Sequence, residues 1–151
     1  MKKSPYRNII EFAIVNEVEA EEFYSDAAKK VRDPYIKKMF NELADEEKRH
    51  RKILKGILAR ESIGGYFTED RDYKVAETIG KPKLSTDMKP ADAIALAMKN
   101  EEEAMKQYNV LADTCSDPDL KNVFLDLAAM EREHKFKMEK AFVDIGYPEV
   151  W

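Results

Sequence analysis

Cysteine and histidine are scarce in this chain of 151 residues, which has one cysteine and two histidines. The lone Cys115 excludes a disulfide within the chain and any metal site built from several cysteines. No apolar run approaches the roughly 20 residues that a membrane-spanning helix needs. The N-terminus has no apolar stretch after its first lysines, so we expect no signal peptide and a cytoplasmic location.

Net charge is also small, because 30 acidic residues nearly balance 26 basic ones and leave a formal charge of -4. Without a basic cluster the chain is not expected to bind nucleic acid, and no membrane partner is expected either. Hydrophobic residues make up 44% of the chain and charged residues 37%, which is typical of a folded globular protein. The length predicts a single domain over residues 1–151.

Four segments show the apolar spacing of amphipathic helices, and three of them begin with a Ser-Pro or Asp-Pro pair. In such a pair the first side chain caps the helix and proline occupies its first position. Gly64 and Gly65 are expected to end the second helix, and Gly146 and Pro148 the fourth. The predicted helices span residues 5–32, 34–61, 90–115 and 118–145, with a connector over 62–89.

This pattern predicts an all-α fold, an antiparallel four-helix bundle made of two helical hairpins. A helix of about 28 residues is roughly 40 Å long. The connector 62–89 can run that length, because an extended chain covers about 3.3 Å per residue. The second and third helices are therefore expected to run parallel, joined by one long crossover.

The two halves of the sequence repeat without a gap. An offset of 84 residues separates three pairs of polar residues, which are Glu17 and Glu101, Glu47 and Glu131, and His50 and His134. The same offset relates the Asp-Pro pair at Asp33 to the one at Asp117. A duplicated helical hairpin explains this register. It predicts a bundle with approximate two-fold symmetry and one site on the symmetry axis.

These six polar residues lie on the apolar stripes, where carboxylates are not expected. In each half a histidine follows a glutamate by three residues, so that both side chains share a helix face. Four buried carboxylates would repel one another, and no lysine or arginine lies on the stripes. Two divalent cations would balance the charge, and carboxylate with imidazole suits iron or manganese, and zinc less specifically. The predicted metal ligands are Glu17, Glu47, His50, Glu101, Glu131 and His134.

The sequences around these residues resemble the rubrerythrin-type domain of the ferritin-like di-iron carboxylate superfamily. The matching stretches are 16–24 (NEVEAEEFY) and 43–50 (LADEEKRH), with their repeats at 100–108 and 127–134. The resemblance covers all four helices and includes the full set of six ligands. It implies a ferritin-like bundle that binds two iron ions, with manganese or a mixed pair as alternatives.

The resemblance also implies roles for residues near the ligands. Tyr24 and Tyr108 would hydrogen-bond ligand carboxylates. Lys48 stands where haem-binding relatives carry methionine, so no haem is expected. Glu46 lies one turn before His50 and can support a ligand, whereas its counterpart in the second half is Met130. The two metal positions are therefore expected to differ.

The chain also departs from rubrerythrin. Ala104 stands where rubrerythrin carries a further glutamate, which argues against redox-linked ligand exchange. The Cys-ligated iron domain of rubrerythrin is lacking, so we expect a separate electron-donor protein such as a rubredoxin. Other charged residues of these stretches are expected to be solvated, namely Glu19, Glu21, Glu22, Glu102 and Glu103. Tyr66, Phe67 and Tyr73 in the connector are expected to cover a bundle face or a dimer contact.

Four functions fit these residues. The first is a non-haem di-iron oxidoreductase that acts on hydrogen peroxide or dioxygen, as in rubrerythrin-like peroxide reduction. The alternatives are a ferroxidase or iron-handling protein, a dimanganese catalase-like enzyme, and a bundle with purely structural metals. A homodimer through the exposed hairpin faces is a further expectation.

Overall fold

The structure is a computed structural model, and it describes residues 5–60, 63–67 and 83–145. Four long helices account for most of these residues: α1 (Pro5–Lys30), α2 (Pro34–Leu58), α3 (Pro90–Thr114) and α4 (Pro118–Ile145). A short 3₁₀ helix, η1 (Ile63–Tyr66), follows α2. Ser4, the predicted cap of α1, and Gly146 and Pro148, the predicted stop of α4, lie outside the described residues.

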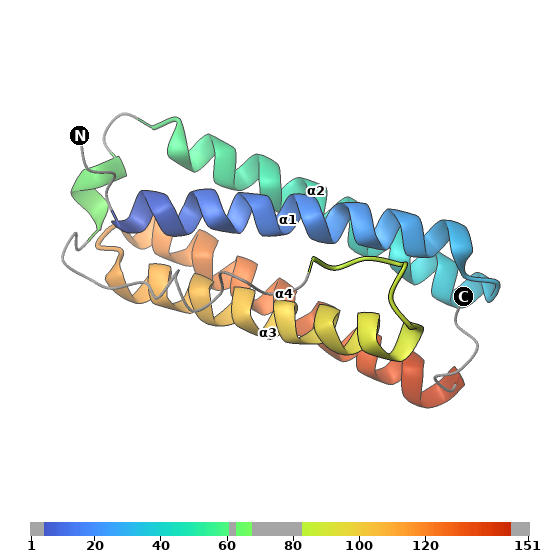
Figure 1. Ribbon diagram of the computed structural model, residues 1–151. Coiled ribbons are helices and arrows are strands. Elements are labelled where there is room, and N and C mark those ends of the chain that lie inside the picture. Colours follow the sequence, from blue (N-terminus) through green and yellow to red (C-terminus); the bar gives the residue numbers. More distant parts are fainter. Residues whose placement is uncertain (1–4, 61–62, 68–82, 146–151) are drawn as a thin grey trace.

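The four long helices form a bundle of two antiparallel hairpins, α1 with α2 and α3 with α4 (Figure 1). Helices α2 and α3 run in the same direction. Helix α1 contacts α3, and α2 contacts α4. This arrangement confirms the all-α bundle with one long crossover that the periodicity and the connector length predict.

Capping by aspartate explains where α2 and α4 begin. Asp33 has an extended backbone, and its Oδ1 accepts hydrogen bonds from Tyr35 N at 2.9 Å and Ile36 N at 3.0 Å. Asp117 Oδ2 likewise accepts from Leu120 N at 2.9 Å. These bonds satisfy backbone donors that have no partner inside the helix.

The helices end slightly earlier than the predicted ends at residues 32, 61 and 115. The correction is largest for α2, which ends at Leu58, so Gly64 and Gly65 do not stop it and lie instead in η1. At this end Arg60 N donates to Ile57 O at 3.2 Å, a tighter turn than an α-helix makes. This tighter turn ends α2 at Leu58, before the end at residue 61 that the apolar spacing predicts.

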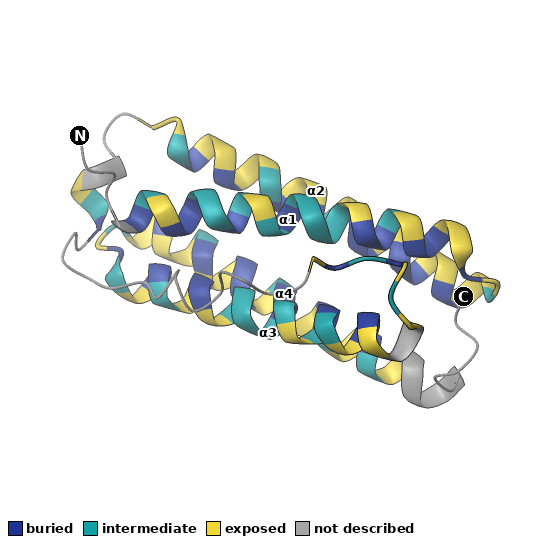
Figure 2. Cartoon of the chain, viewed as in Figure 1, coloured by how far each residue is buried: buried dark blue, intermediate teal, exposed yellow. Residues whose placement is uncertain are grey.

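Buried side chains line the inner faces of all four helices, and exposed ones face outward (Figure 2). They form two apolar clusters, one containing Tyr24, Phe40 and Ile94 and the other containing Tyr108, Phe124 and Leu54. The core is therefore split into two apolar parts along the bundle. The polar residues described below lie between these parts.

The start of the connector covers one end of the bundle. Phe67 stacks on Tyr6 with ring centroids 4.6 Å apart and also meets Phe124 edge-on. Ser116 N donates to Tyr66 O at 2.8 Å, which ties η1 to the turn between α3 and α4. Phe67 therefore covers a face of its own bundle, which is one of the two roles expected for these aromatic residues. Tyr73, for which the same roles were expected, lies outside the described residues.

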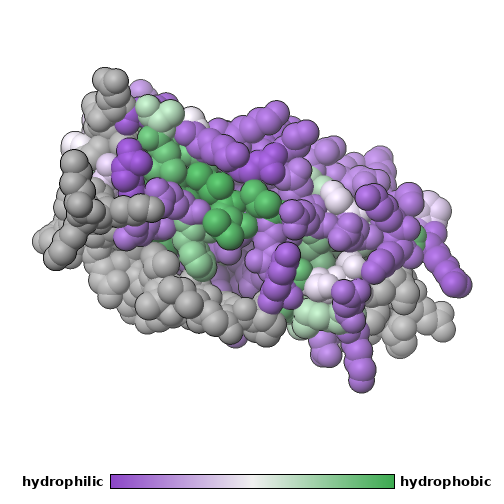
Figure 3. Space-filling model, turned by 45° about the horizontal axis from the view of Figure 1, so that its top comes forward, coloured by the Kyte–Doolittle hydropathy of each residue, from purple (hydrophilic) through white to green (hydrophobic). Residues whose placement is uncertain are grey.

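Most of the molecular face in Figure 3 is hydrophilic, with one apolar area within it. Among the residues whose burial the structure describes, the most exposed large hydrophobic side chains are Tyr35, Val15, Phe136, Ile53 and Leu125. Within the described ranges, no helix combines the length and the apolar composition that crossing a bilayer would require.

Candidate metal centre

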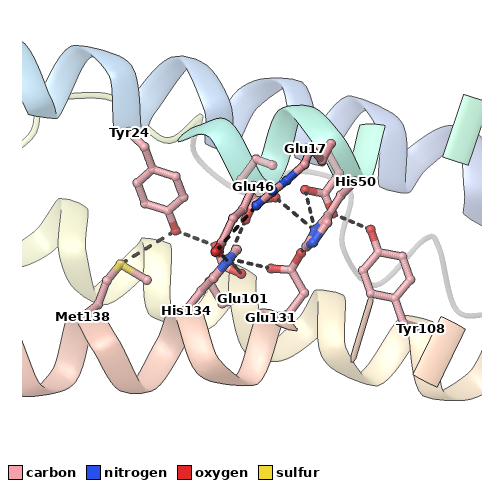
Figure 4. Close-up of polar contacts among 11 residues, drawn as sticks. Glu17, Tyr24, Glu46, His50, Glu101, Tyr108, Glu131, His134 and Met138 are labelled. Atoms are coloured by element: carbon pink, nitrogen blue, oxygen red, sulfur yellow. Dashed lines mark hydrogen bonds and ion pairs between the residues drawn. The ribbon is translucent and has the colours of Figure 1, made fainter. Parts of the chain in front are cut away.

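All six predicted ligands come together inside the bundle. Figure 4 labels five of them, which are Glu17, His50, Glu101, Glu131 and His134. Each helix contributes from its inner face: Glu17 from α1, Glu47 and His50 from α2, Glu101 from α3, and Glu131 and His134 from α4. None of the six side chains belongs to a residue more than 4% exposed. Because helical spacing places i and i+3 on one face, each Glu-x-x-His motif directs both of its side chains inward.

The six residues form two overlapping groups of four. One group is Glu17, Glu47, His50 and Glu131, and the other is Glu47, Glu101, Glu131 and His134. Within each group the candidate ligand atoms lie within 4.8 Å of one another. Glu47 and Glu131 belong to both groups, so the geometry provides two adjacent positions with two shared carboxylates.

Each histidine contacts the shared glutamate of the other hairpin. His50 Nδ1 lies 2.9 Å from Glu131 Oε1, and His134 Nδ1 lies 2.8 Å from Glu47 Oε1. The two rings are nearly parallel, with centroids 5.8 Å apart. Both Nδ1 atoms therefore face the carboxylates, and they would be the nitrogens available to a metal.

In the absence of metal, protons balance much of the charge. Burial favours neutral imidazoles, but neighbouring carboxylates outweigh it and raise the pKa of His50 and of His134 to about 9. Burial and the Glu131 carboxylate raise the pKa of Glu17 to about 8. Burial would also raise the pKa of Glu131, but the two histidines lower it to about 2. The site thus holds cationic imidazoles that a metal ion would have to deprotonate.

Glu17 and Glu101 each belong to only one of the two groups, and we call them the outer carboxylates. Two tyrosines hold them across the symmetry axis. Tyr24 of α1 donates its hydroxyl hydrogen to Glu101 Oε1 of α3 at 2.5 Å, and Tyr108 of α3 donates to Glu17 Oε1 of α1. Burial raises the pKa of both phenols well above their usual range, so that they remain donors. The predicted contact is therefore present, and it joins the two hairpins.

The second oxygen of each outer carboxylate tests whether a metal fits. Glu17 Oε2 and Glu101 Oε2 are buried and have no hydrogen-bond partner among the residues that the structure describes. They lie 3.7 Å and 3.6 Å from the Nδ1 atoms of His50 and His134, which is too far for a hydrogen bond. A buried carboxylate oxygen without a partner is costly, and a cation between it and the imidazole nitrogen would satisfy both. The donor set suits iron or manganese.

The two halves of the site differ at one carboxylate. Glu46 of α2 hydrogen-bonds His134 Nε2, which fixes the orientation of that ring. The pKa of Glu46 is lowered, chiefly by this hydrogen bond. Met130 occupies the equivalent place in α4, and among the described residues no carboxylate hydrogen-bonds His50 Nε2. The expected difference between the two positions thus has a structural cause.

A small cavity adjoins the carboxylates between α1 and α3. Its walls include Asn16 and its repeat partner Asn100, together with Ala20 and its partner Ala104. The cavity also touches the carboxylates Glu17, Glu47, Glu101 and Glu131. Ala104, where rubrerythrin has a glutamate, therefore contributes open space beside the candidate centre.

Sequence reasoning missed two residues of this cavity. Glu19 was expected to be a solvated charge, but it lines the cavity and accepts a hydrogen bond from Leu84 N at 2.5 Å. Leu84 lies in the connector and is buried over the site. In the sequence Leu84 is only an apolar residue within a polar stretch, and that pattern does not predict where its side chain lies in the fold. Glu21 is also not simply solvated, because it pairs with Arg51 at 2.6 Å.

Comparison with known families and structures agrees with this geometry. A sequence profile of the family described as Rubrerythrin matches residues 8–142. A hypothetical protein from Pyrococcus furiosus aligns with a TM-score of 0.66 and 25% identity, over 91% of this chain and 87% of that one. A protein from Thermotoga maritima, provisionally described as a ferritin-like diiron-carboxylate protein, aligns with a TM-score of 0.69 and 22% identity, over 93% and 96%. No curated protein matched the sequence.

Proposed function

This chain belongs to the rubrerythrin family, and from that premise we propose that it binds two iron ions and acts as a non-haem oxidoreductase on hydrogen peroxide or dioxygen. The observation that carries the proposal is the pair of overlapping, buried four-residue groups that share Glu47 and Glu131. Two adjacent metal ions can each supply one electron to the same oxidant.

The residues around the centre have distinct tasks in this proposal. Glu17 and His50 would hold one ion, Glu101 and His134 the other, and the two shared glutamates both. Tyr24 and Tyr108 each hydrogen-bond one oxygen of Glu101 or Glu17, so the second oxygen of each carboxylate would be the one left to hold a metal. The apolar clusters on either side exclude bulk water, and the small cavity leaves room for the oxidant.

The proposed reaction balances with a two-electron reductant. Reduction of one hydrogen peroxide to two water molecules takes two electrons and two protons, and two ferrous ions held by the six residues would supply the two electrons. In this proposal a separate protein such as a rubredoxin returns the electrons. Dioxygen is the second oxidant that the cavity would admit.

Elemental analysis of protein purified without oxygen tests the metal content, and optical spectra after addition of peroxide test the reaction. We expect close to two irons per chain and oxidation of the ferrous protein much faster than that of free Fe²⁺. A new near-ultraviolet absorption band of the oxidised iron centre should appear. Oxidation at the rate of free Fe²⁺ would contradict the proposal. Two manganese ions with oxygen evolution would favour a catalase-like enzyme instead.

A matched pair of variants links the result to the site. Glu131→Gln removes a shared carboxylate and should lower both the metal content and the rate of peroxide-driven oxidation. Glu102→Gln changes a partly exposed glutamate of α3 that pairs with Lys106 and Lys135 and is not among the six candidate ligands, and it should alter neither. Equal loss in both variants would show that the six residues do not form the centre.

A further inference from the structure

Residues 83–88, which we call the covering segment, lie over the cavity beside the carboxylates. The segment is the last part of the connector before α3, and it runs along the bundle beside α1 and α3 (Figure 1). Leu84 is its buried apolar side chain, with 4% of its surface exposed, and it lines the cavity together with Glu17 and Glu101. A connector residue therefore forms part of the wall around the candidate centre.

The covering segment is attached to α1 at two points. Leu84 N donates to Glu19 Oε1 at 2.5 Å, and Lys30 Nζ donates to Thr86 Oγ1 at 2.7 Å. Thr86 is itself buried. Glu19 and Lys30 are eleven positions apart on α1, which is about three helical turns or roughly 16 Å. Two separated anchors hold the Leu84 side chain in one place.

The segment also forms its own turn and packs on the core. Met88 N donates to Ser85 O at 3.4 Å, and Asp87 N donates to Ser85 Oγ at 3.1 Å. Leu84 belongs to the apolar cluster that contains Phe40, and Met88 packs against the same cluster. Leu84 is therefore held by packing as well as by hydrogen bonds.

The cavity under Leu84 is small. The centre of a water-sized sphere can occupy about 30 Å³ of it. One water molecule needs roughly 10–15 Å³ by this measure, so the space holds about two or three water molecules. Hydrogen peroxide and dioxygen fit wholly inside such a space, whereas the organic group of an alkyl or aryl hydroperoxide would collide with its walls, which include Leu84. All peroxides contain the same O–O bond, so the cavity would distinguish between them by the size of the attached group.

We propose that Leu84, held by the covering segment, limits the oxidant of this centre to hydrogen peroxide and dioxygen and excludes bulky organic hydroperoxides. The inference rests on the proposed function and adds the substrate class. Reduction of an organic hydroperoxide would need the same two electrons and two protons and would give an alcohol and water. Only the size of the group on the peroxide differs between the two substrates.

The first test compares two oxidants on three proteins loaded with ferrous iron. Stopped-flow spectroscopy measures oxidation by hydrogen peroxide and by cumene hydroperoxide in the natural protein, Leu84→Ala and Leu96→Ala. Leu96 packs against the same apolar cluster but does not line the cavity, so its variant controls for lost packing. In Leu84→Ala the rate with cumene hydroperoxide should rise at least about tenfold, the lower end of the discrimination that one methylene group can give, with little change for hydrogen peroxide.

An unchanged ratio of the two rates in Leu84→Ala, or an equal rise in Leu96→Ala, would overturn the proposal. Rapid oxidation of the natural protein by cumene hydroperoxide would also overturn it. Leu84→Val removes one methylene group and keeps a branched apolar side chain, so it serves if the alanine variant does not fold. Circular dichroism and thermal unfolding check the fold of each variant.

The second test reads access without any redox reaction. Azide and benzoate are added to the cobalt-loaded protein, and the visible spectrum of the metal reports binding. We expect azide to change the spectrum of both the natural protein and Leu84→Ala, and benzoate to change that of Leu84→Ala alone. Benzoate binding to the natural protein would refute the size limit. If hydrogen peroxide fails to oxidise the ferrous protein, the proposed function fails while this test still decides the role of Leu84.

Discussion

At the scale of single residues, Glu46 makes the two histidines different. It hydrogen-bonds His134 Nε2, and the repeat places Met130 where the same contact to His50 would come from. A carboxylate on the distal nitrogen orients a ligand ring and makes it a better donor to the metal. The position formed with His134 should therefore bind metal more tightly than the one formed with His50.

Glu46→Gln should weaken the tighter position about 10–100-fold, the usual cost of losing such a support. Titration of the metal-free protein with Co²⁺, followed optically, should show two unequal binding steps that become similar in this variant. Met130→Glu should instead strengthen the weaker step by giving His50 the same kind of partner.

An exposed glutamate of α1 provides the control for charge. Glu22→Gln should leave both binding steps of the Co²⁺ titration unchanged, because this side chain faces outward. A single step in the natural protein, or no difference between Glu46→Gln and Glu22→Gln, would refute the inequivalence of the two positions.

At the scale of helices, the Asp-Pro pairs determine where α2 and α4 begin. Asp33→Ala removes two hydrogen bonds to backbone N–H groups and should cost about 1 kcal/mol of unfolding free energy. For a domain of this size that lowers Tm by roughly 2–4 °C. Differential scanning calorimetry measures the shift, and Asp117→Ala should give a similar one.

The control for this prediction is Asp126→Ala, which changes an exposed aspartate inside α4. Its Tm should stay close to that of the natural protein. Metal content should be unchanged in all three variants, because the caps lie at the helix ends and the centre lies in the middle. A cap variant that loses metal but keeps its Tm would contradict this separation.

At the scale of the whole molecule, protonation of the centre links stability to pH. The pKa values of His50 and His134 rise from 6.5 to about 9 on folding, and that of Glu17 rises from 4.5 to about 8. The folded metal-free protein thus binds more protons than the unfolded chain between these values. Linkage then requires stability to fall as pH rises.

We therefore expect the Tm of the metal-free protein to decrease between about pH 6.5 and 9. Below pH 6.5 the contribution of the two histidines is fully present, and it is lost as pH passes through 9. Thermal unfolding in a chelating buffer at several pH values measures this. A Tm that rises over the same range would show that the imidazoles are not held as cations.

The affinity for metal should rise as pH rises, which is opposite to the stability of the metal-free protein. The ions replace the protons on Glu17, His50 and His134, so binding near neutral pH should release roughly three protons per chain. Calorimetric titration in buffers of different ionisation enthalpy counts them. Uptake of two metal ions without proton release would contradict the proton balance derived for the site.

Much of this protein could be predicted from its sequence, because the relevant information is local. Helical spacing places Glu47 and His50 on one face whatever the helix packs against. The offset of 84 residues predicts that the second hairpin repeats the first and contributes equivalent side chains. Aspartate before proline marks a helix start by its own chemistry. The four helices and the six candidate ligands follow from these features.

Only the tertiary structure decided which groups meet across helices. It paired Tyr24 with Glu101 and Tyr108 with Glu17, and it placed Glu46 against the histidine of the other hairpin. It also brought Leu84 of the connector over the cavity. Spacing along one helix fixes a face, but the register between helices and the path of an aperiodic connector depend on how the whole core packs. For that reason the candidate ligands could be predicted from the sequence, while the surroundings that set their charge, asymmetry and access could not.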